Sequence, residues 1–118
     1  MLIIKQKFFD EIISGNKKQE FRELKPTTYK KYVVTNENGE AEEEDGIFKP
    51  IDYDAIQFYV GYNKDRDQAL VEVKGAVIEI LTDEDGKDIT YEYEGVEYVL
   101  SQITYDLGKV LSVTKGKV

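Results

Sequence analysis

A short charged segment holds the side chains most able to do chemistry in this chain. Lys17, Glu20 and Arg22 follow Gly15 within a few positions. Alternate side chains of a strand point the same way, so Glu20 and Arg22 would share one face while Phe21 points into the core. A carboxylate between two cations stays ionised, and the cations can then hold an anion or a carbonyl oxygen. The spacing therefore predicts a recognition pocket, with a solvated strand edge carrying an ordinary ion pair as the alternative.

Two residue types that support much nucleophilic and metal chemistry are absent. The chain has no cysteine and no histidine, which excludes disulfides, thiolate zinc sites and catalysis by Ser-His-Asp or Cys-His arrangements. Any catalysis would therefore use carboxylates, lysine, tyrosine or hydroxyl groups. The acidic stretch 37–45 lacks the ordered ligand spacing of a calcium loop, so a solvated loop is the favoured interpretation. We expect no metal and no cofactor.

Charge is divided unevenly along the chain. The net charge of −8 disfavours binding to a long duplex nucleic acid, because neutralising phosphates supplies most of that affinity. Residues 1–31 carry eight Lys or Arg and four Asp or Glu, a balance of +4, whereas the rest carry eight and twenty, a balance of −12. A cationic first third in an acidic protein suits a compact anionic ligand.

Length and hydropathy predict the general class of protein. The 118 residues, 41% of them hydrophobic, fit one domain over residues 1–118. No apolar stretch approaches the length that spans a bilayer, and residues 1–5 lack the basic-then-apolar layout of a secretory signal. We therefore expect a cytoplasmic protein with no membrane partner; the sequence leaves the oligomeric state open.

The elements that position the charged segment follow from apolar spacing. Residues 2–4 are typical of a short buried strand, and apolar residues at helical spacing predict a helix over residues 7–14. Gly15 is a natural C-terminal stop for that helix. The segment 26–28 resembles a helix start, followed by a turn or two over residues 29–33.

Later segments have the alternation and turn residues of a β-protein. Asn38-Gly39 and Glu94-Gly95 predict hairpin turns. Several short strands with glycine-containing turns and one or two early helices indicate a mostly β (α+β) fold, built as a small closed or nearly closed barrel. The predicted strands cover residues 19–24, 55–62, 69–81 with a bend or break at Gly75, 89–93, 96–100, and 105–113 with a bend at Gly108.

A second group of candidate residues surrounds Tyr62. This residue ends a predicted strand and is followed by Lys64 and Arg66. Aromatic rings beside cations can stack on a base and hold its phosphate, as in proteins that read single-stranded RNA. For Tyr62 this interpretation and a purely structural one are both open, whereas packing across the sheet is favoured for Tyr59. Lys5 follows the first strand and either borders the same cleft as the charged segment or is solvated.

One motif resembles the signature of ASCH domains, a family within the PUA-like superfamily: Phe8-Phe9-x-x-Ile12-Ile13-x-Gly15-x-Lys17-x-x-Glu20-x-Arg22. The order of helix, GxKxxExR turn and strands ending in residues 107–111 is similar across most of the chain. The resemblance implies a PUA-like pseudo-β-barrel, with one or two short helices near the N-terminus and a cleft beside the motif. In that superfamily such clefts bind RNA, recognise modified bases or, in some members, catalyse hydrolysis.

The leading hypothesis is an ASCH-like binding module. Its cationic cleft would recognise a nucleotide, a modified nucleoside or short single-stranded RNA, with Glu20 orienting the cations and accepting hydrogen bonds from a base edge. The predicted ligand-binding residues are Lys17, Glu20, Arg22, Tyr62 and Lys5.

Two other functions are open. The first is a hydrolase acting on an acylated nucleoside or an RNA phosphodiester, with Lys17 and Glu20 as its catalytic residues. An ASCH branch that hydrolyses N4-acylated cytidine uses a lysine, a threonine nucleophile and a distant glutamate. Lys17 matches that lysine, Glu20 stands at the position of the threonine, and Glu72 and Glu79 are candidates for the glutamate by location. The second is a protein-interaction module that uses the acidic stretch 37–45.

Overall fold

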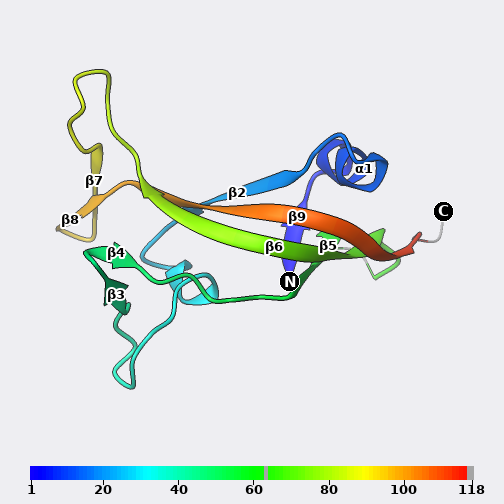
Figure 1. Cartoon of the computed structure of the whole chain (residues 1–118), viewed down its shortest axis with the longest axis horizontal. Coiled ribbons are helices and arrows are strands. Elements are labelled where there is room, and N and C mark those ends of the chain that lie inside the picture. Colours follow the sequence, from blue (N-terminus) through cyan, green and yellow to red (C-terminus); the bar gives the residue numbers. More distant parts are fainter. Residues whose placement is uncertain (63, 117–118) are drawn as a thin grey trace. The chain divides into compact units, whose positions relative to one another are not determined.

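The computed structural model describes residues 1–62 and 64–116, which form two compact units (Figure 1). Strands dominate both units, which confirms the mostly β prediction. The expectation that residues 1–118 form a single domain stays a prediction. Unit 1 consists of Met1–Glu20, Tyr53–Gly75 and Tyr105–Val118, and unit 2 of Phe21–Asp52 and Ala76–Thr104.

A five-stranded sheet has the order β1-β5-β6-β9-β2. Within it, β1 pairs in parallel with β5, and β5 pairs in antiparallel with β6. Because β1 and β2 are its edges, the described residues form no closed barrel. The predicted barrel is therefore wrong in this respect. The alternation of residues along a strand indicates that one face is buried, but a sheet closes into a barrel only when its two edge strands pair with each other. The strands are β1 (Leu2–Ile4), β2 (Gln19–Leu24), β5 (Ala55–Val60), β6 (Gln68–Ile80) and β9 (Ser101–Thr114).

Unit 1 contains the single α-helix of the described residues. The helix α1 (Gln6–Ser14) begins one residue before the predicted start and buries Phe9 and Ile12 on one face. It contacts β5, whose Phe58 is fully buried. Gly15 ends the helix as predicted: its φ of 84° lies in the left-handed region, and its N–H donates to the Ile12 carbonyl.

Unit 2 carries two hairpins and a 3₁₀ turn. The hairpin of β7 (Thr90–Tyr93) and β8 (Val96–Val99) turns at Glu94-Gly95, where both residues have positive φ, as the dipeptide predicts. The acidic stretch 37–45 includes β3 (Glu43–Glu44), which forms a shorter hairpin with β4 (Ile47–Phe48). The turn predicted over residues 29–33 is the 3₁₀ helix η1 (Tyr29–Lys31).

The strands that contain Gly75 and Gly108 are each continuous, so the alternative of two separate strands meeting at Gly75 is wrong. Gly75 lies inside β6 and Gly108 inside β9. At Gly108 a β-carbon would overlap the carboxylate of Glu72, whose Oε1 accepts a hydrogen bond from the N–H of Lys109 at 3.3 Å. The glycine therefore makes room for a neighbouring side chain.

The face of β2 is the reverse of the one predicted. Phe21 is 48% exposed, whereas Glu20 is 7% exposed and Leu24 is buried with it. The alternation itself was predicted correctly, but a strand pattern does not say which face is covered when both carry apolar and charged residues.

No helix among the described residues is long and apolar enough to cross a membrane.

Candidate functional site

Lys17 follows α1 and folds back along that helix. Its backbone N–H donates to the Glu11 carbonyl at 3.0 Å, and its ammonium lies 5.4 Å from the centre of the Phe8 ring. Phe8 is itself exposed, so the pair forms a cation–aromatic contact at the surface of unit 1. Such a contact at an exposed site stabilises by about 0.5–1 kcal/mol.

The motif residues Glu20 and Arg22 lie on β2. Glu20 is the last residue of unit 1 and is buried, whereas Arg22 belongs to unit 2 and is half-buried. Buried carboxylates in proteins are paired or hydrogen-bonded, so the environment of Glu20 favours a structural or orienting role. The catalytic role of Lys17 and Glu20 stays a prediction from the motif.

Lys5 and Tyr62 both follow the same end of the parallel pair β1–β5. The register places Ile4 opposite Val60, so Lys5 and the Gly61-Tyr62 turn leave adjacent strands at the same end. Tyr62 is 85% exposed, and Lys5 is also exposed. Sequence reasoning identified both residues but not that they follow the same end of a strand pair, because parallel partners carry no local signal of their pairing.

Arg66 holds the turn that presents Tyr62. Its guanidinium lies 4.0 Å from the centre of the Tyr59 ring, and its Nη1 donates to the Gly61 carbonyl at 2.9 Å. Stacking and hydrogen bonding together fix a planar guanidinium more firmly than either contact would alone. Tyr59 therefore supports the turn through Arg66.

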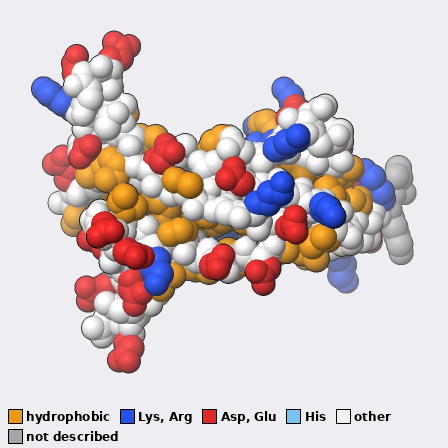
Figure 2. All heavy atoms as spheres, viewed as in Figure 1, with side chains coloured by type: hydrophobic (Ala, Val, Ile, Leu, Met, Phe, Trp, Pro, Cys, Tyr) orange, Lys and Arg blue, Asp and Glu red, His pale blue; other side chains and the backbone are white. Residues whose placement is uncertain are grey.

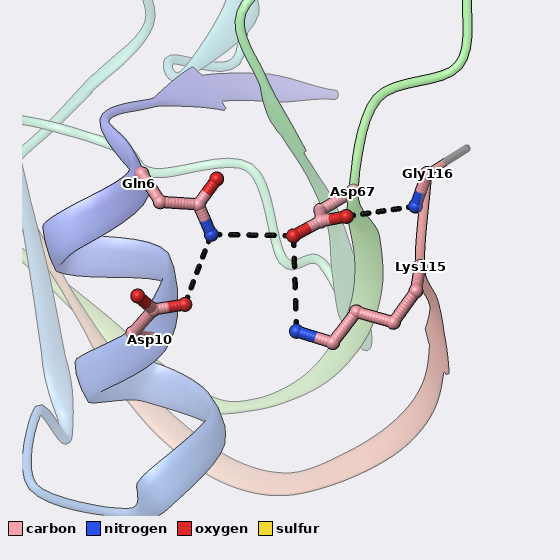
Figure 3. A network of polar contacts seen from close by, with 5 residues as sticks. All are labelled: Gln6, Asp10, Asp67, Lys115 and Gly116. Atoms are coloured by element: carbon pink, nitrogen blue, oxygen red, sulfur yellow. Dashed lines mark hydrogen bonds and ion pairs between the residues drawn. The ribbon is translucent and has the colours of Figure 1, made fainter. Parts of the chain in front are cut away.

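A polar network ties three segments of unit 1 together beside this turn (Figure 3). Asp67 accepts hydrogen bonds from the N–H of Gly116 at 2.7 Å and from Gln6 Nε2 at 3.2 Å, and it pairs with the ammonium of Lys115 at 3.7 Å. Gln6 Nε2 also donates to Asp10 on the next turn of α1. A β-carbon at position 116 would overlap the Asp65 carbonyl, so the close approach of this segment requires glycine.

This network makes the stability of the protein depend on pH. The Gly116 N–H, then Gln6 and Lys115, hold the pKa of Asp67 below its ordinary value of 3.8. The ionised carboxylate therefore stabilises the folded state above pH 3.8, and this contribution is lost as the pH falls through the lower folded-state value. We expect Asp67→Asn to lower the urea midpoint at pH 7, and this deficit to shrink toward zero below pH 3.8.

Urea unfolding of the parent and variant between pH 7 and pH 2 measures the effect. The control is Asp65→Asn, an exposed carboxylate of the same turn, which should change the midpoint little at any pH. A deficit of Asp67→Asn that stays constant down to pH 2 would contradict the assignment.

Unit 2 contains two adjoining hollows that the sequence did not predict. Their volumes are about 440 Å³ and 640 Å³, and both are lined by Phe48, Tyr98, Val99 and Ser101. We call the two hollows together the apolar groove. Tyr91 stacks on Tyr98 in its wall, with ring centres 5.8 Å apart. Burial, then the negative charge of Glu23 and the neighbouring Tyr98, raise the pKa of Tyr91 above its ordinary value of 10.0.

Among residues 1–62 and 64–116, no group of three or more carboxylates is close enough to hold a metal ion.

Comparison with protein-family models, with curated proteins and with solved structures finds no match. The resemblance to ASCH domains therefore stays a prediction carried by its motif.

Proposed function

We propose that the chain is an ASCH-like binding module of PUA-like pseudo-barrel type that recognises a nucleotide, a modified nucleoside or short single-stranded RNA through unit 1. Lys5 and the exposed Tyr62 both follow the same end of the β1–β5 pair, and this arrangement carries the proposal. A base stacks on Tyr62, and its phosphate lies against Lys5 and the exposed Lys64 of the same turn.

The division of charge between the units supports an anionic ligand on unit 1. Unit 1 carries ten Lys or Arg and eight Asp or Glu, a balance of +2, whereas unit 2 carries six and sixteen, a balance of −10. Association with an anion is favoured at the cationic part and opposed at the acidic part. A short ligand can bind the cationic unit without approaching the acidic one, whereas the phosphates of a long duplex would also be repelled by the acidic unit.

The remaining motif residues have different places in this proposal. Lys17 extends the cationic surface of unit 1 along α1, where its ammonium lies over Phe8. The roles of Glu20 and Arg22 stay predictions from the motif. A cytoplasmic location, where nucleotides and RNA are abundant, belongs to the same proposal.

The experiment is a binding titration against labelled nucleotides and RNA tetramers at several salt concentrations. We expect saturable binding that weakens as salt rises. Lys5→Ala should reduce the slope of log affinity against log salt by about 0.7, the value for one phosphate contact on a single strand.

Lys74→Ala provides the matched control, because Lys74 is an exposed lysine of unit 1 on β6. It should leave both affinity and slope unchanged. If the parent chain binds none of the panel, or if Lys5→Ala retains the parent's slope, the proposal is wrong.

A further inference from the structure

Apolar side chains gather on unit 2 between acidic ones. Figure 2 shows hydrophobic side chains clustered over the part of unit 2 that carries β4 and β8, with carboxylates around them. Within this part, Ile47 is 53% exposed and Val99 is 40% exposed. Both line the apolar groove, as do the exposed side chains of Phe48 and Ile80. Contiguous exposed apolar surface with a polar rim is typical of a surface that binds a partner.

The rim of the groove is anionic. Three carboxylates line the larger hollow, and they come from three different strands: Glu43 of β3, Glu79 of β6 and Glu97 of β8. Lys25 is the only cation among the described residues that line either hollow, and its ammonium lies 3.8 Å from Glu23. The groove thus combines an apolar floor with a strongly negative border.

We propose that the apolar groove binds an extended peptide segment of a partner protein in which apolar residues and Lys or Arg are interspersed. The two hollows share the wall formed by Phe48, Tyr98 and Val99, so neighbouring apolar side chains of one segment fit one hollow each. Side chains between them meet the carboxylates of the rim. Two adjoining hollows bordered by carboxylates are therefore suited to binding an elongated peptide.

Charge complementarity selects this occupant over others. Nucleic acid would bring phosphates to a unit whose balance is −10, and a second copy docked through the same face would bring like charges together. A single metal ion is a poor occupant, because no three of the described carboxylates lie close enough together to bind one. Cations spaced along a chain match carboxylates spaced along a rim.

The test is selection of a phage-displayed library of random peptides, about twelve residues long, against the full chain. We expect enriched peptides to contain both Lys or Arg and aliphatic or aromatic residues. A synthetic enriched peptide should bind more weakly as salt rises, because the exposed charge pairs are screened. Replacing its Lys and Arg with Glu, or its apolar residues with Ser, should each weaken binding at least about tenfold.

Matched variants of the protein locate the site. Val99→Thr and the double variant Glu79→Gln, Glu97→Gln should each weaken binding of that peptide by about fivefold. Val96→Thr repeats the first change on the same strand outside the groove, and Glu84→Gln with Asp85→Asn repeats the second in a turn of unit 2. Both controls should bind as the parent does, and circular dichroism checks that all variants are folded.

Four results would overturn the proposal. They are enrichment of no peptide, enrichment of peptides without basic residues, equal loss in groove and control variants, and a concentration-dependent dimer of the parent that Val99→Thr abolishes. The last result would assign the groove to a second copy of the chain. Because the peptide site and the proposed nucleotide site lie on different units, either can fail without the other.

Discussion

Replacing Tyr62 with alanine should weaken binding of short single-stranded RNA by about fivefold to a hundredfold, with little change in stability. Stacking of one base on an aromatic ring is worth about 1–3 kcal/mol, which corresponds to this range. At 85% exposure the ring buries little surface in the fold, so its removal leaves the core intact. Fluorescence anisotropy with a labelled RNA tetramer, together with urea unfolding, separates the two effects.

Two controls make this result specific to stacking. Tyr62→Phe keeps the aromatic face and should bind within about twofold of the parent, because stacking does not require the hydroxyl group. Tyr93→Ala removes an exposed ring from β7 of unit 2 and should have no effect on RNA binding. Equal affinity of the parent and Tyr62→Ala would refute the stacking role.

The second large effect is on stability. Phe58→Ala should lower the free energy of unfolding by about 3–5 kcal/mol, because it removes a fully buried aromatic ring and leaves a cavity. Phe58 lies in the middle of β5, with Leu2 of β1 and Ala69 of β6 as its partners in register. Since small domains are stable by only about 5–15 kcal/mol, the loss is a large fraction of the total.

Urea denaturation monitored by circular dichroism measures this change. Phe21→Ala is the matched control: it is the same substitution at an exposed ring of β2, and it should cost about 1 kcal/mol or less. If Phe58→Ala does not fold, Phe58→Leu should still fold with a smaller loss. Losses of similar size for Phe58→Ala and Phe21→Ala would contradict the burial that the structure assigns to the two rings.

Features that depend on neighbours along the chain were predictable. Apolar residues at helical spacing gave the helix Gln6–Ser14 to within one residue, and Gly15 ended it because only glycine enters the left-handed region without strain. The Glu94-Gly95 turn and its two strands followed in the same way. In each case the pattern that predicts the element lies within the residues that form it.

The candidate site was predictable only in its parts. Lys5, Lys17 and Tyr62 were chosen by type and position, and they lie at the surface or partly exposed in unit 1. Lys5 and Tyr62 follow the same end of a strand pair because β1 pairs in parallel with β5, whose residues are far apart in the sequence. The motif likewise did not show that Glu20, rather than Phe21, turns to the buried face.

The sequence by itself therefore determined the residue chemistry: no histidine, no cysteine, a cationic first third and an acidic remainder. It also determined the helix, its stop and the Glu94-Gly95 turn. The tertiary structure alone decided which face of β2 is buried, that the sheet of described residues stays open, and that an apolar groove forms in unit 2. These features arise from contacts between distant segments, and local propensity and spacing do not specify which segments meet.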